Sequence, residues 1–208
     1  RAAHGRAVWP AGGCLGAADE DLVDAMTGGG PCESSAGYVG HELNGSGGSA
    51  PISAKTQTFH RPVGPIAYDC VKVIIVRDGS AILFSEFGQK AVNVGDAVLL
   101  CANTLCGSEP EGRITTTTVY MDTDYLIDQV FWQHVGLLCD RLDARDLAER
   151  MYLEPAQILR LGEECAATLM PWLDELVTLS LDKGARFLRI QALWFAVMDR
   201  IAPHIRVT

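Results

Sequence analysis

The sequence lacks any segment that would send the chain into or across a membrane. No apolar run approaches the roughly 18 residues that span a bilayer, and no basic start leads into an apolar core. The seven cysteines are scattered and include no C-x-x-C pair, which is typical of reduced thiols in a cytosolic protein. We therefore expect a cytoplasmic protein without membrane contacts.

Clusters of basic residues are also missing. The chain has 17 Lys and Arg against 26 Asp and Glu, a formal net charge of −9. Such a balance disfavours holding nucleic-acid phosphates. With 208 residues, of which 48% are hydrophobic, the chain suits one domain or one core with a small helical appendage.

Motifs of the common enzyme classes are absent as well. There is no Gly-x-Gly-x-x-Gly between a strand and a helix, and no phosphate-binding loop. The nearest approach to a nucleophile elbow, at 45–47, lies in a low-complexity stretch. These absences argue against an enzyme.

Residues 1–51 are rich in Gly and Ser, notably at 28–30 and 45–49. This composition favours a flexible or irregular N-terminal arm. A loose terminus and an arm that closes over a ligand both remain open.

Residues 52–122 have the texture of short strands. Strands are expected over 54–61, 68–77, 80–86, 91–94, 97–102 and 113–121. Turns are expected at Asp78-Gly79, Gly95-Asp96 and Pro110–Gly112. No helix separates the strands, so the pattern predicts an antiparallel barrel or sandwich rather than a βαβ fold.

Residues 123–208 have a helical texture. One helix should run to about residue 138, and a second should begin at Asp143. Pro155 suits the first turn of a third helix, which Pro171 should kink or restart and Gly184 should end. A last helix should run over 185–201.

The last predicted helix carries apolar residues over more than half of its circumference. The main stripe predicts a dimer interface made of Phe187, Ile190, Trp194, Val197, Met198 and Ile201. A second stripe contains Leu188, Ala192 and Phe195. A helix sandwiched inside its own fold is the alternative.

The stretch from Val71 to Asn103, with its Asp78-Gly79 and Gly95-Asp96 turns, resembles the cupin-like sensor domain of the AraC family of transcription regulators. Segments 124–132, 157–162 and 191–195 resemble actinobacterial members, so the likeness covers about 52–208. It implies an α+β fold, a cupin-like antiparallel β-barrel over 52–122 followed by a C-terminal helical bundle over 123–208.

The resemblance also implies a function and partners. It points to a domain that binds a small-molecule effector and forms a homodimer. DNA would be bound only through a helix-turn-helix domain that this chain lacks, so we expect a truncated sensor.

Catalytic cupins hold a metal with His and Glu, and the matching positions here are Tyr68, Lys72 and Cys106. A cationic Lys72 would oppose a metal. We predict no metal, no cofactor and no catalysis. The alternative is a cupin-type enzyme with an unusual metal site.

An inward-pointing Lys72 would be a buried cation and would favour an anionic or carbonyl-bearing effector. Lys72 could instead pair with Asp69 or Glu86, or point to solvent. The full set of candidate ligand-binding residues is His60, Tyr68, Lys72, Thr116, Thr118 and Tyr120. The strand register that decides which of them face inward is not set by the sequence. A filled barrel that only dimerises is a further possibility.

Overall fold

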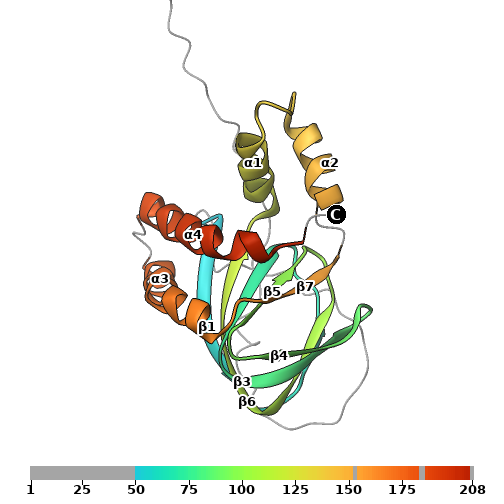
Figure 1. Ribbon diagram of the computed structural model, residues 1–208, viewed down its shortest axis with the longest axis vertical. Helices are drawn as coiled ribbons and strands as arrows, with labels where there is room; N and C mark the ends of the chain where they lie inside the picture. The colour runs from blue at the N-terminus through green and yellow to red at the C-terminus, as the bar shows by residue number, and fades with distance from the viewer. Residues whose placement is uncertain (1–49, 152–153, 183–185, 207–208) are drawn as a thin grey trace, which may run out of the picture.

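The computed structural model describes residues 50–151, 154–182 and 186–206 (Figure 1). The predicted N-terminal arm, residues 1–51, lies almost entirely outside this range.

A curved, seven-stranded antiparallel sheet forms the body of the molecule (Figure 1). The sheet order is β1-β6-β3-β5-β7, with β2 paired to β6 and β4 paired to β3. The strands are β1 (Ile52–Phe59), β2 (Val63–Ile66), β3 (Val71–Ser85), β4 (Gly88–Asn93), β5 (Asp96–Leu100), β6 (Cys106–Met121) and β7 (Ala156–Arg160).

Strands β3 and β6 are long and continuous where the sequence predicted turns. Asp78-Gly79 was predicted to be a hairpin turn, but it lies inside β3, where the pairing with β6 shifts register on both sides of it. Gly79 has φ 79°, and a Cβ there would lie 2.0 Å from the carbonyl oxygen of Arg113. The glycine therefore serves a bulge that bends two paired strands. The turn predicted at Pro110–Gly112 likewise lies inside β6.

The described part of the chain also contains four α-helices and one short 3-10 helix. They are α1 (Thr123–Gln133), α2 (Arg141–Met151), α3 (Glu163–Leu181), α4 (Phe187–Ile201) and the 3-10 helix η3 (Ala202–His204). The Asp122 carboxylate accepts a hydrogen bond from the Tyr125 backbone N–H and so caps α1. The helices pack as two pairs, α1 with α2 and α3 with α4 (Figure 1). The predicted α+β fold, an antiparallel sheet followed by helices, is confirmed.

One predicted helix is wrong in its first part. Residues 156–160 form β7, which pairs antiparallel with β5 from Asp96↔Arg160 to Leu100↔Ala156. Strand β5 is buried at every position, so the backbone N–H and C=O groups along its free edge need hydrogen-bond partners. Pairing with β5 therefore outweighs the local preference for a helix after Pro155. Helix α3 begins only at Glu163 and continues through Pro171.

In helix α4, most of the residues predicted to form a dimer interface are buried inside their own chain. Ile190, Trp194, Val197 and Ile201 are buried in the core of their own chain, with Trp194 only 2% exposed. They pack with α3 and one face of the sheet, which was the alternative interpretation of this helix. The second stripe is the open one: Leu188 is 80% exposed and Phe195 43%.

The other two residues of the predicted interface have different neighbours. The ring of Phe187 meets that of Tyr125 edge-on at 6.3 Å. Met198 packs against the core from its rim. Four of the six predicted interface residues are therefore buried within one chain, while Phe187 and Met198 lie at the edge of its core.

Candidate functional site

Alternate residues of β3 enter two different environments. Val71, Val73 and Ile75 point to the outer face of the sheet, where helices α3 and α4 cover them. Ile74 and Val76 point to the inner face, toward an apolar cluster enclosed by the curved sheet. Since side chains alternate along a strand, Lys72 lies on the inner face as well.

The pairing of β3 with β6 aligns most of the predicted ligand-binding residues. Lys72 lies opposite Tyr120, Ile74 opposite Thr118, and Val76 opposite Thr116. The register that the sequence left open thus brings Lys72, Thr116, Thr118 and Tyr120 to one face.

Lys72 is the centre of a buried polar cluster at one end of this inner face. It is only 6% exposed, and its Nζ lies 3.9 Å from the centroid of the Tyr68 ring. The rings of Tyr68 and Tyr120 are 6.3 Å apart at 60°. We call Tyr68, Lys72 and Tyr120, together with the neighbouring thiols of Cys70 and Cys106, the Lys72 cluster. The ammonium over the Tyr68 ring is a cation–π contact.

Burial dominates the electrostatics of the Lys72 cluster. Burial lowers the pKa of Lys72, and the nearby thiols of Cys106 and Cys70 raise that pKa again in part. It raises the pKa of Tyr120 to about 12, an effect that Tyr68 and Cys70 strengthen and the hydrogen bond with Thr118 offsets. Burial also raises the pKa of the Cys70 and Cys106 thiols, and Lys72 lowers both.

No carboxylate among the described residues forms an ion pair with Lys72. Its predicted alternative partner Asp69 is exposed and accepts a hydrogen bond from the side-chain amide of Asn103 at 3.4 Å. Solvent exposure of Lys72 is excluded by its burial. The ring of Tyr68 offers Lys72 a cation–π contact, and a buried cation with this little compensation favours an acceptor group.

His60 does not join the Lys72 cluster. It is exposed and follows the end of β1 that pairs with Ile114, near the middle of β6 and six residues along that strand from Tyr120. The register of β1 thus places His60 away from the Lys72 cluster, and the proposed site does not include it. Thr116 lies beside Val76, on the same face as Lys72 but within the apolar part.

Most of the inner face is packed rather than open. Its buried apolar side chains are those of Val76, Ala81, Leu83, Val92, Val98, Leu100, Ile114 and Ala156. Most of the space that the curved sheet encloses is thus filled by apolar side chains.

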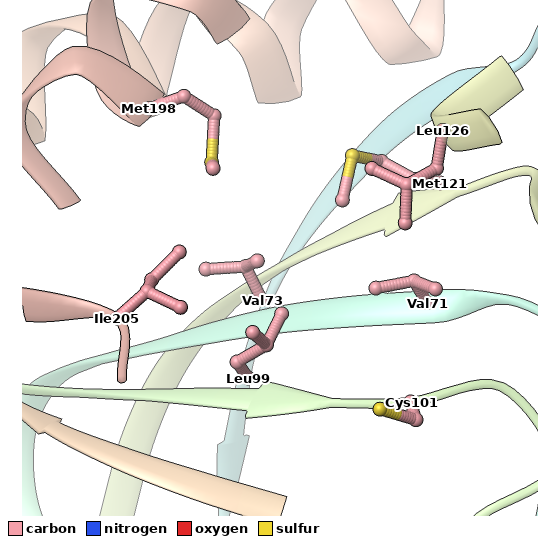
Figure 2. A pocket seen from close by; sticks show the side chains of 8 residues that line it. All are labelled: Val71, Val73, Leu99, Cys101, Met121, Leu126, Met198 and Ile205. Atoms are coloured by element: carbon pink, nitrogen blue, oxygen red, sulfur yellow. The ribbon is translucent and has the colours of Figure 1, made fainter. Parts of the chain in front are cut away.

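A small apolar cavity lies on the opposite, outer face of the sheet (Figure 2). Its volume is about 50 Å³. Its lining comes from the sheet, from α1, from α4 and from the C-terminal segment: Val71, Val73, Leu99, Cys101, Met121, Leu126, Met198 and Ile205. Figure 2 shows Met198 and Ile205 facing the strand residues across the space. A cavity of this size admits a few carbon atoms, not a whole effector.

Sequence reasoning missed this cavity. A signal for the cavity was present, because both alternating sets of β3 are apolar and so both faces of that strand must be covered. The contribution of Met198 and Ile205 depends on long-range packing and had no local signal.

Two classes of site receive no support from the described residues. Within the described ranges, no group of three or more His, Cys, Asp or Glu side chains is placed to hold a metal ion. No helix in the same ranges is long and apolar enough to cross a bilayer.

Comparison with known proteins gives similarities of fold only. No family model matches the chain, and no curated protein matches it. A solved structure of ToxT from Vibrio cholerae is similar with 12% identity and a TM-score of 0.47, over 76% of this chain and 58% of ToxT. A cupin 2 conserved barrel domain protein from Salinispora arenicola is similar with 18% identity and a TM-score of 0.33, over 41% of this chain and 74% of that protein.

A cupin superfamily protein from Desulfitobacterium hafniense is similar with 13% identity and a TM-score of 0.34, over 36% of this chain and 72% of that protein. The chain spans somewhat more than half of the length of ToxT.

Proposed function

We propose that this chain is the effector-sensing domain of an AraC-type transcription regulator, and that a small molecule with a carboxylate or carbonyl group binds at the Lys72 cluster. In this proposal the domain is not an enzyme, and DNA is bound by another part of the regulator. The resemblance of 52–208 to AraC-family sensor domains motivates the family.

The observation that carries the proposal is the burial of Lys72 without a carboxylate partner among the described residues. A buried ammonium is costly unless an acceptor offsets the lost hydration. Tyr68 provides a ring face and Tyr120 and Thr118 provide hydroxyls on the same side. An effector oxygen near the Lys72 Nζ would complete this set, and its affinity would depend on that one cation.

A thermal-shift screen with small monocarboxylates and carbonyl compounds tests the proposal. A ligand that binds only the folded state raises the melting temperature by mass action. We expect a hit to stabilise the wild-type chain and to lose its effect in Lys72→Met. The matched control is Lys55→Met, which removes an exposed lysine of β1 and should keep the response.

Three outcomes would contradict the proposal. The first is a hit that stabilises Lys72→Met as strongly as the wild type. The second is a panel without any hit, which would favour a domain with a filled barrel. The third is stoichiometric iron, manganese or zinc in the purified protein, which would favour a cupin-type enzyme.

We also propose that the domain forms a homodimer through the exposed stripe of α4. Leu188 and Phe195 are seven residues apart and therefore lie on one face of the helix, with Ala192 between them. Large exposed apolar side chains gathered on one face are typical of interaction surfaces. A second copy of the chain would cover them by a symmetric contact.

A further inference from the structure

A second pocket, separate from the Lys72 cluster, lies where the C-terminal segment meets β4 and β7. Its volume is about 200 Å³, and most of its lining is polar. The lining residues are Lys90, Glu154, Gln157, Ile158, Arg160 and Arg206. We call it the Arg206 pocket. Three cations thus converge in a chain whose net charge is −9.

Two of these cations are held in place by backbone carbonyl groups. The Nζ of Lys90 donates a hydrogen bond to the carbonyl oxygen of Ala156 at 2.6 Å. The guanidinium of Arg160 donates to the carbonyl oxygen of Ala91 at 3.2 Å and pairs with Asp96. Each side chain is therefore oriented before any ligand arrives, which lowers the entropic cost of binding.

The third cation is positioned by a buried glutamine. The side-chain amide of Gln157 donates to the carbonyl oxygen of Arg206 at 3.2 Å, and its oxygen accepts from the Arg206 N–H at 3.1 Å. Gln157 is itself 3% exposed. This two-point contact fixes the backbone of Arg206 against β7, while its guanidinium forms no ion pair with any residue in the described ranges.

The carboxylates near the pocket do not neutralise it fully. Asp96 is engaged by Arg160, and Glu154 lies 3.7 Å from the Nζ of Lys90, a long contact for an ion pair. Three cations against these two carboxylates leave one positive charge, centred on the guanidinium of Arg206. A guanidinium presents a planar fork of N–H donors that matches the oxygens of phosphate and carboxylate groups.

We propose that the Arg206 pocket binds a small oxyanion with two or more negative charges, a phosphate or a polycarboxylate. The anion would accept hydrogen bonds from Arg206 and from the remaining N–H groups of Lys90 and Arg160. Because Arg206 belongs to the C-terminal segment and the other two cations to β4 and β7, an occupied pocket would brace that segment against the sheet.

Isothermal titration calorimetry of the chain tests this with inorganic phosphate and with citrate, against sodium chloride at matched ionic strength. We expect at least one oxyanion to bind, and Arg206→Gln to weaken binding about tenfold or more, as expected for a lost charge-assisted hydrogen bond. Arg200→Gln is the matched control, because it removes an exposed arginine of α4 outside the pocket and should leave affinity unchanged.

A second variant changes affinity in the opposite direction. Glu154→Gln removes the competing carboxylate from the pocket and should tighten binding severalfold. Binding of phosphate alone would assign the site to phosphate groups, and binding of citrate alone to polycarboxylates. The proposal is overturned if neither anion binds beyond the effect of chloride, or if Arg206→Gln and Arg200→Gln bind equally well.

The same titration separates this site from the proposed effector site. Lys72→Met should leave binding of phosphate or citrate at the Arg206 pocket unchanged. Parallel loss of binding in Lys72→Met and Arg206→Gln would contradict two independent sites.

Discussion

Both faces of strand β3 are buried, but burial has opposite effects on the stability of the fold at the two faces. On the outer face, Val71, Val73 and Ile75 meet apolar side chains of α3 and α4. On the inner face, Lys72 lies beneath the ring of Tyr68 without a carboxylate partner among the described residues. Burial of the apolar outer-face side chains stabilises the folded state, whereas burial of the Lys72 ammonium destabilises it. The degree of burial alone therefore does not indicate a ligand-binding site. A buried charge without an opposite charge beside it does.

Truncation of the outer-face core should give the largest effect. Trp194→Ala should lower the free energy of unfolding by about 3–5 kcal/mol, because it removes a fully packed aromatic side chain. Urea denaturation monitored by far-UV circular dichroism measures this. Phe195→Ala, one residue along the same helix, is the control and should change stability by less than about 0.5 kcal/mol. An equal loss of unfolding free energy in the two variants would contradict the conclusion that Trp194 lies on the buried stripe and Phe195 on the exposed one.

Removal of the inner-face cation should act in the opposite direction. Lys72→Met should raise the free energy of unfolding at neutral pH by about 1 kcal/mol, because an apolar group of similar length replaces a buried charge. Urea denaturation of the two proteins side by side measures the difference. A loss of stability would show that Lys72 is fully compensated in the folded state.

The stability gap between wild type and Lys72→Met should depend on pH. The folded-state pKa of Lys72 lies below its ordinary value of 10.5. Between these two values the unfolded chain holds more protons, so wild-type stability rises with pH relative to the variant. We expect the gap to close as pH rises toward 10.5 and to be largest below the folded-state pKa. A gap that widens with pH would contradict this assignment.

The smallest effect on stability is expected at the exposed stripe of α4. Phe195→Ser should leave the free energy of unfolding within about 0.5 kcal/mol of the wild type, since the side chain is partly in water. Sedimentation velocity should nevertheless show weaker self-association. Thr178→Ala, an exposed position on α3, is the control. A dimer that survives in Phe195→Ser would remove the proposed interface.

Much of the sheet and of the helices could be predicted from local patterns. The run of β-branched residues from Val71 to Val76 predicted the first part of β3, and the apolar spacing of 185–201 predicted α4 within two residues. The bulge at Gly79 and the strand at 156–160 could not be predicted this way. Both depend on a partner distant in sequence, β6 for the bulge and β5 for β7.

The candidate site was predicted in its residue types but not in its extent. Tyr68 and Lys72 stood out because they occupy positions that match metal ligands of catalytic cupins, and Lys72 because an inward-pointing lysine would be a buried cation. The exclusion of His60 and the assembly of the Arg206 pocket required the register of β1 and the contact of Gln157 with Arg206. Such contacts join residues far apart in sequence, so no local pattern records them.

The sequence by itself determined the class of the fold, because strand and helix periodicities are local properties of neighbouring residues. It also determined that a cation would interrupt β3. Only the tertiary structure decided which face of β3 carries Lys72, which stripe of α4 is buried, and where the cations of the C-terminal segment and the sheet converge. These outcomes depend on strand register and long-range packing, in which a shift of one residue reverses every side chain of a strand.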